Sequence, residues 1–250
     1  MSELKFPTEV IELPSKGLLY PADHPLAKGT VEMKYMTAKE EDILTNPNYI
    51  EKGIVVEKLL QSLLITKVDL NEFFTGDKNA LMIAARILGY GKDYTFKYED
   101  KPYTVDLSKL EPKSLDPNIF SERNKFKFTL PVSENEVVFK LLNEKDEAKV
   151  DEEVAGLKKL NKDSNPSITT RLKHMIVSVN GDEDKTNIKN FVDNFMLAAD
   201  SRALRNYAIQ ITPDITMKFT AVNSNGVEED VDIPIGITFF YPDFEWGSSY

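Results

Sequence analysis

The residue types that most often carry out catalysis are scarce in this chain. It has no cysteine and only two histidines, His24 and His174. Without thiols, disulfides, thiolate metal sites and cysteine nucleophiles are all excluded. The metal-binding HExxH pattern, the glycine-rich phosphate loops and the GxSxG nucleophile turn are missing as well. The residue types therefore favour a protein that has no catalytic site, no cofactor and no metal site.

Three acidic clusters remain as candidates for chemistry: residues 182–184, 228–232 and 40–42. The first lacks the glutamate that a calcium loop needs at its twelfth position, so we expect a solvated turn. The second lies on a predicted strand, whose alternation places its acidic residues on a face toward solvent or a partner. The third lies in a predicted first helical turn, where negative charge favours the helix dipole. A carboxylate-based hydrolase is a remote alternative, because a reactive pair could be hidden among the 41 acidic residues.

Composition limits the class of protein and of partner. The 250 residues are 41% hydrophobic and 29% charged, which is typical of a folded chain that buries a core. The net charge of -10 argues against nucleic acid or an anionic membrane as the main partner. No apolar run approaches the roughly 20 residues of a membrane helix. The acidic N-terminal segment is unlike a signal peptide, so we expect an intracellular protein.

Hydrophobic periodicity predicts an α+β fold: a helical cluster packed with antiparallel β-hairpins, preceded by an extended N-terminal arm. We expect one interleaved unit in which the hairpins at 94–107 and 216–233 share a sheet. The expected segments are an arm and strand (1–36), a helical cluster (37–91), β-hairpins (92–142), a helical segment (143–212), and a C-terminal hairpin with an aromatic tail (213–250).

Several local features follow from residue type. Ser15 to Gly17 predicts a turn, and the Thr37–Glu40 pair matches a capping box. We expect Asp77 to cap the helix 78–89, and Arg86 within it to make an internal ion pair rather than a partner contact. A further helix is predicted over 168–179 and a final strand over 237–241.

The arm and the tail are the candidate contact regions. A proline-rich arm is already extended and loses little entropy when a partner orders it. Aromatic side chains in the tail are of the type that anchors interfaces. The alternatives are an edge strand packed on its own domain and a tail that caps its own core. The candidate contact residues are Ser15, Leu18, Tyr20, Phe244 and Trp246.

Three stretches, taken in order, resemble the baseplate hub proteins of T4-like tailed bacteriophages, and most closely the hub assembly proteins. They are Leu13-Pro-Ser-Lys-Gly-Leu-Leu-Tyr-Pro21, Met33-Lys-Tyr-Met-Thr-Ala-Lys-Glu-Glu-Asp-Ile-Leu44 and Gly76-Asp-Lys-Asn-Ala-Leu-Met-Ile-Ala-Ala-Arg-Ile-Leu-Gly-Tyr-Gly91. Residues 213–217 and 234–242 are similar to the end of the same family. The resemblance covers nearly the whole chain and is weakest over 108–165.

The resemblance implies a chaperone-like role in tail assembly through contacts with other hub proteins, without catalysis. It places the chain in the host cytoplasm during assembly. The alternative is a permanent structural subunit of the virion's tail baseplate. Some relatives carry Cys-x-x-Cys pairs at two hairpin tips, which here correspond to residues 98–101 and 222–225. Neither tip contains cysteine, so a thiolate zinc site is excluded. The oligomeric state stays open.

Overall fold

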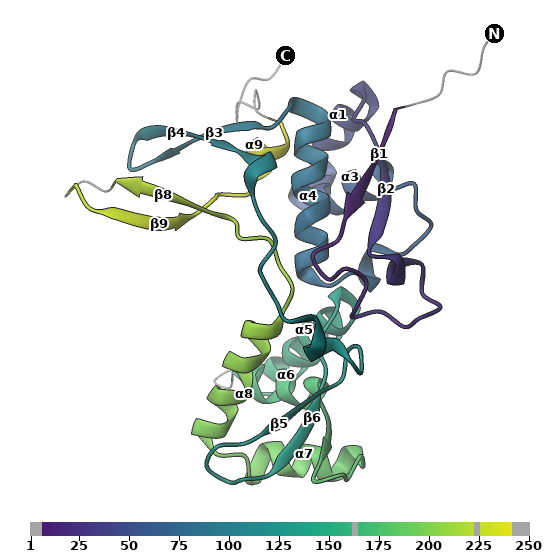
Figure 1. Cartoon of the computed structure of the whole chain (residues 1–250), viewed down its shortest axis with the longest axis vertical. Coiled ribbons are helices and arrows are strands. Elements are labelled where there is room, and N and C mark those ends of the chain that lie inside the picture. The colour runs from purple at the N-terminus through teal and green to yellow at the C-terminus, as the bar shows by residue number, and fades with distance from the viewer. Residues whose placement is uncertain (1–6, 162–164, 223–225, 242–250) are drawn as a thin grey trace.

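The protein has an α+β fold, as predicted, in a computed structural model that describes residues 7–161, 165–222 and 226–241. Figure 1 shows two lobes stacked along the long axis. Residues 7–112, 213–222 and 226–241 form one, which we call the terminal lobe. Residues 113–161 and 165–212 form the other, the middle lobe. None of the helices in the described ranges is long and apolar enough to cross a membrane.

The terminal lobe is built on a hairpin-like pair of strands and a bundle of helices. Strand β1 (Thr8–Glu12) pairs antiparallel with β2 (Thr30–Lys34). The loop between them closes back, because the Leu13 amide donates to the Gly29 carbonyl at 2.8 Å. The N-terminal segment over residues 7–36 is therefore a strand packed on its own lobe, which is the alternative to an arm that reaches a partner. The helices are α1 (Ala38–Leu44), α2 (Pro47–Glu51), α3 (Val55–Leu63) and α4 (Thr75–Tyr90).

Two projecting hairpins complete this lobe (Figure 1): β3 (Asp93–Tyr98) with β4 (Lys101–Asp106), and β8 (Lys218–Val222) with β9 (Glu228–Asp232). They form two separate two-stranded sheets, which corrects the expected single sheet. Aromatic rings join them instead: the ring of Phe219 lies 4.7 Å from that of Phe96 and 5.2 Å from that of Tyr103. The turn predicted after Val222 lies largely outside the described residues.

Helix α9 (Ile237–Phe240) replaces the predicted last strand. Phe239 and Phe240 are both fully buried. A strand would send these neighbours to opposite faces, whereas a helical turn lets both rings enter one core. The ring of Phe239 packs edge-on against Tyr94 at 4.9 Å, which fixes α9 between α4 and the first hairpin.

In its described residues, the middle lobe has four helices and a three-stranded antiparallel sheet of order β5-β6-β7. The helix predicted over 168–179 ends at Met175, and its last four residues form the third strand. Their alternating burial and β-branched side chains suit a strand. The elements are β5 (Phe126–Thr129), β6 (Glu136–Phe139), α5 (Glu144–Leu160), α6 (Ser167–Met175), β7 (Ile176–Val179), α7 (Lys185–Asn194) and α8 (Ala198–Ile211).

Two chain segments connect the lobes and pair with each other. The Lys113 amide donates to the Asp214 carbonyl at 2.7 Å, and the Thr216 amide donates to the Glu111 carbonyl at 3.1 Å.

Short 3-10 turns lie at η1 (Pro25–Lys28), η2 (Leu70–Glu72), η3 (Leu107–Lys109) and η4 (Pro117–Phe120).

Candidate functional site

The most elaborate polar cluster surrounds Asp77, in the first turn of α4. One carboxylate oxygen accepts the Ser15 amide at 2.9 Å. The other accepts the Ser15 hydroxyl and the Tyr20 hydroxyl, each at 2.7 Å. Asp77 is fully buried, and Ser15 and Tyr20 are only 2% and 3% exposed. Asp77 therefore fastens the loop after β1 to α4, and it is not the helix cap that the sequence predicts; Phe74 holds that position.

The backbone of the loop after β1 turns so that the Ser15 and Tyr20 hydroxyls both reach Asp77. Lys16 and Gly17 have φ of 49° and 76°, so the chain turns sharply at the predicted position. The Lys16 amide donates to the Leu13 carbonyl, and the Gly17 amide donates to the Ser15 hydroxyl. An added Cβ at Gly17 would lie 2.4 Å from the Ala27 carbonyl oxygen, so this position requires glycine for space as well as for conformation.

Burial controls the electrostatics of this cluster. Desolvation raises the pKa of the Asp77 carboxyl, even though the hydrogen bonds from Tyr20 and Ser15 act in the opposite direction. Burial and the neighbouring Asp77 also raise the pKa of the Tyr20 hydroxyl. The protonated forms of the Asp77 carboxyl and the Tyr20 hydroxyl are therefore both favoured, and the Tyr20 hydroxyl is the donor of the hydrogen bond between them.

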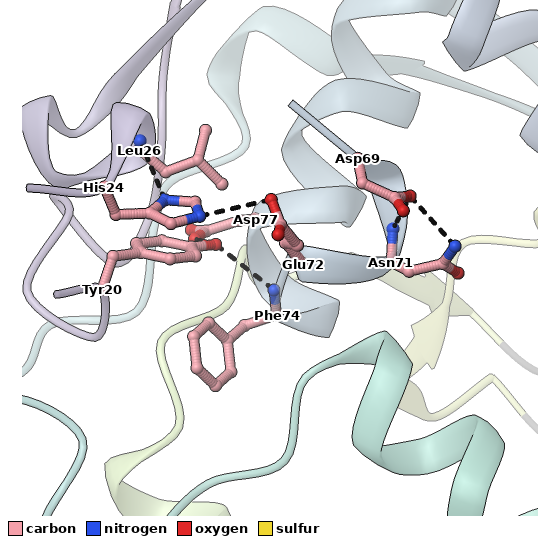
Figure 2. Close-up of polar contacts among 8 residues, drawn as sticks. All are labelled: Tyr20, His24, Leu26, Asp69, Asn71, Glu72, Phe74 and Asp77. Atoms are coloured by element: carbon pink, nitrogen blue, oxygen red, sulfur yellow. Dashed lines mark hydrogen bonds and ion pairs between the residues drawn. The ribbon is translucent and has the colours of Figure 1, made fainter. Parts of the chain in front are cut away.

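Figure 2 shows His24 stacked on the Tyr20 ring, at 5.2 Å between centroids. Its Nδ1 accepts the Leu26 amide at 3.2 Å, and its Nε2 lies 3.3 Å from Glu72. Ser15, His24 and Asp77 thus lie near one another without the order of a catalytic triad. The serine donates directly to the carboxylate, and both histidine nitrogens have other partners. The cluster holds the loop in place and offers no nucleophile.

Glu40 is a second buried carboxylate with a different environment. Its oxygens accept the Lys34 ammonium at 2.8 Å, the Ser62 hydroxyl at 2.6 Å, and the Thr37 amide and hydroxyl at 2.9 and 2.6 Å. The predicted capping box is therefore present and also bridges β2, α1 and α3. Burial acts to raise the pKa of Glu40, but the hydrogen bonds, led by that from Lys34, outweigh it and lower the pKa to about 2.

Two further buried charges have structural partners. Asp200, in the first turn of α8, accepts the Val132 and Ser133 amides at 2.8 and 3.1 Å. Burial opposes its ionisation, but these hydrogen bonds outweigh it and lower its pKa. Arg86 is 3% exposed and donates to the carbonyls of Gly91 and Asp93 at 2.8 and 3.0 Å. The predicted internal ion pair is therefore wrong, because Arg86 donates to main-chain carbonyls and not to a carboxylate.

The remaining sequence candidates lie apart from one another. Asp182 and Asp184 lie in an exposed turn, as expected, and the Asp184 carboxylate also caps α7 by accepting the Thr186 amide at 2.9 Å. Glu228, Asp230 and Asp232 are exposed along one face of β9. His174 lies 2.8 Å from Glu153 at the surface. In the part of the chain that the structure describes, no group of three or more potential ligands could hold a metal ion.

The proposed contact residues have mixed outcomes. Ser15 and Tyr20 are interior residues bonded to Asp77, so their assignment to a partner surface is wrong. Leu18 packs partly buried against the same core. Phe244 and Trp246 lie outside the described residues. No signal in the sequence joins Ser15 to Asp77, because 62 residues separate them.

Exposed apolar side chains mark other parts of the surface. Val10 on β1 is 64% exposed. Around the Asp200 anchor at the far end of the middle lobe, Val132, Phe195 and Leu197 are all exposed.

Comparisons with protein-family models, with characterised proteins and with solved structures find no match for this chain.

Proposed function

We propose that this chain is a bacteriophage tail baseplate hub assembly protein. It acts in the host cytoplasm, as a chaperone for other hub proteins, through protein contacts and without catalysis. The alternative is a permanent structural subunit of the hub in the virion. The proposal rests on the family resemblance of three stretches of the sequence and on how those stretches pack.

The observation that carries the proposal is that the three stretches meet in one lobe. The stretch 13–21 supplies Ser15 and Tyr20, which bond to Asp77 in the stretch 76–91. The stretch 33–44 supplies Lys34 and Glu40, which fix β2 to α1 and α3. Residues that resemble the hub family thus form the contacts that define this lobe. We infer that these stretches resemble the hub family because this lobe has the same fold as the corresponding part of the family's proteins.

The surface is consistent with a protein that acts by contacts. The chain has a net charge of -10, and the acidic face of β9 lies on a hairpin that projects from the body (Figure 1). Such a surface attracts basic partners and repels acidic ones. Exposed apolar residues near Asp200 add a second kind of surface, which is suited to an apolar patch on a partner.

The first experiment deletes the gene from a phage that encodes this chain and examines the lysate by electron microscopy. We expect heads without contractile tails, and complementation by the intact gene. Normal tails in the deletion would overturn the proposal. Quantitative mass spectrometry of purified tails against lysate then separates the two roles. Abundance in the lysate with absence from tails indicates a chaperone, whereas stoichiometric presence in tails indicates a structural subunit.

A further inference from the structure

Strand β1 pairs with β2 through alternate residues only. The Tyr35 amide donates to the Pro7 carbonyl, and the Leu13 amide donates to the Gly29 carbonyl. In an antiparallel ladder such bonded positions recur every second residue, so Glu9 and Ile11 also face β2. The amides and carbonyls of Thr8, Val10 and Glu12 therefore point away from β2, toward the opposite edge of the sheet.

The two outer edges of this sheet differ. On the β2 side, the Glu32 carbonyl accepts the Ile65 amide at 2.9 Å, and the Glu32 amide donates to the Thr66 hydroxyl at 2.9 Å. That edge is closed by the chain that follows α3. On the β1 side, no hydrogen bond within the described residues uses the outward groups of Thr8, Val10 or Glu12. This edge offers an unused row of donors and acceptors.

The exposure of β1 suits strand addition. Thr8, Glu9, Val10 and Glu12 are all exposed, and Val10 is 64% exposed at the centre of the strand. Proteins often protect such edges with charged side chains, above all lysine, or with proline inside the strand. Strand β1 has no lysine or proline, and its charged residues are Glu9 and Glu12. Pro14 lies two residues after Glu12, and its ring removes the next outward donor, so the usable edge is confined to this short strand.

We propose that β1 pairs antiparallel with β1 of a second copy of this chain, about a two-fold axis at Val10. This register pairs all five residues and aligns the outward groups: Val10 faces Val10 of the second copy, and Thr8 faces Glu12. Glu9 then faces Ile11. No two carboxylates lie opposite each other, and the Thr8 hydroxyl can donate to Glu12 of the second copy. The two Glu12 side chains lie about 13 Å apart along the joined strands, at roughly 3.3 Å per residue.

The self-complementary register is the reason for choosing a second copy as the occupant. A shift of the register by two residues shortens the overlap to three residues and removes the central Val10 pair. A shift by one residue sets outward groups against inward ones, so the hydrogen bonds cannot form. The two-fold arrangement thus uses every free group on the edge once, as an isologous interface requires.

The test compares self-association of the purified full chain by sedimentation velocity over a wide concentration range. Val10→Pro removes the outward amide without touching a bond to β2, and Val10→Lys sets two ammonium groups opposite each other. We expect the native chain to dimerise and each variant to weaken the dimer about tenfold or more. Ile168→Lys is the matched control, since Ile168 is 50% exposed on α6 in the middle lobe, and it should dimerise like the native chain.

Amide hydrogen exchange supplies a second measurement. The amides of Thr8, Val10 and Glu12 should become protected as concentration rises, while those of Glu9 and Ile11 stay protected throughout. A monomer at every concentration overturns the proposal. So does a dimer that Val10→Pro leaves intact, because association would then use another surface. Binding of a different protein's strand to monomeric chain at this edge would also overturn it.

Discussion

At the scale of single residues, two buried carboxylates show how the same burial leads to opposite proton affinities. Asp77 has only hydroxyl and amide donors around it, and its pKa is raised. Glu40 has similar donors and also the Lys34 ammonium at 2.8 Å, and its pKa falls to about 2. The nearby positive charge is the main difference between the two sites, because it favours the ionised form that burial opposes.

Replacing Asp77 tests its role as the fastener of the β1 loop. Asp77→Ala leaves the Ser15 amide and two hydroxyls buried without an acceptor, so we expect a loss of about 3 kcal/mol or more in urea unfolding. Asp77→Asn keeps an acceptor and should cost less, about 1 kcal/mol. Asp23→Ala, at an exposed aspartate in the same loop, is the control and should change stability by less than about 0.5 kcal/mol. Equal effects of Asp77→Ala and Asp23→Ala would refute the role.

Asp77 also predicts a pH dependence. Because its folded pKa is raised above the ordinary 3.8, the folded state takes up this proton more readily than the unfolded state. Its contribution to stability is therefore fully present below pH 3.8 and is lost as pH rises through the folded pKa. Relative to Asp77→Asn, the native chain should gain stability as pH falls through that window. A stability difference that does not vary with pH would contradict the raised pKa.

The lowered pKa of Glu40 predicts the opposite pH dependence of stability. Its pKa is lowered from 4.5 to about 2, so its contribution to stability is present above pH 4.5 and is lost as pH falls toward 2. Glu40→Gln should remove this part of the acid destabilisation, while costing about 1–3 kcal/mol at neutral pH. Denaturant unfolding at a series of pH values measures both. Parallel acid slopes for the native chain and the variant would show that Glu40 is not the responsible group.

At the scale of elements, two helical glycines have opposite surroundings. Gly76 lies at the start of α4, where an added Cβ would be 2.0 Å from the Pro213 carbonyl oxygen. Gly156 lies within α5, where an added Cβ meets nothing within 4 Å. The first glycine lets α4 approach the segment that connects the lobes, whereas the second only lowers helix propensity.

Alanine at these two glycines should therefore change stability in opposite directions. We expect Gly76→Ala to destabilise the protein by about 1–3 kcal/mol, because the backbone of residue 213 must move. Gly156→Ala should stabilise it by about 0.5–1 kcal/mol. Thermal unfolding of the two variants provides the measurement, and each is the control for the other. Destabilisation of similar size in both would mean that the close approach at Gly76 is unimportant.

At the scale of the whole molecule, the lobes meet at a junction that two chain segments and the Glu144 amide, which donates to the Phe73 carbonyl at 2.9 Å, hold together. Phe74 of the terminal lobe is buried there and borders a cavity of about 300 Å³ that Leu141, Leu142 and Met175 of the middle lobe also line. Lys78 and Glu144 form an ion pair across the junction at 2.6 Å. Because burying an aromatic side chain stabilises a protein more than a partly exposed ion pair does, Phe74 should determine whether the lobes unfold together.

Phe74→Ala tests this coupling. We expect the native chain to unfold in one calorimetric transition, and the variant to lose about 2–4 kcal/mol and show two transitions. Phe195→Ala is the control, because Phe195 is 62% exposed on the middle lobe and should leave the single transition unchanged. A single transition in Phe74→Ala would mean that other contacts are enough to couple the lobes.

Local features could be predicted from the sequence because their causes lie within a few residues. The turn at Ser15–Gly17 and the capping box at Thr37–Glu40 both formed where residue type predicted. The α+β class followed from the switch between helical and strand periodicity. Each of these depends on side chains that interact with their own neighbouring backbone.

The tertiary structure decided everything that depends on contacts distant in sequence. Asp77 was expected to cap its helix, but it bonds a loop 57 to 62 residues away. Residues 176–179 became a strand because β6 offered a free edge, and 237–240 became a helix because one core accepted both phenylalanines. Residue type fixes local preference, whereas burial and pairing depend on which surfaces meet. Only the folded chain brings those surfaces together.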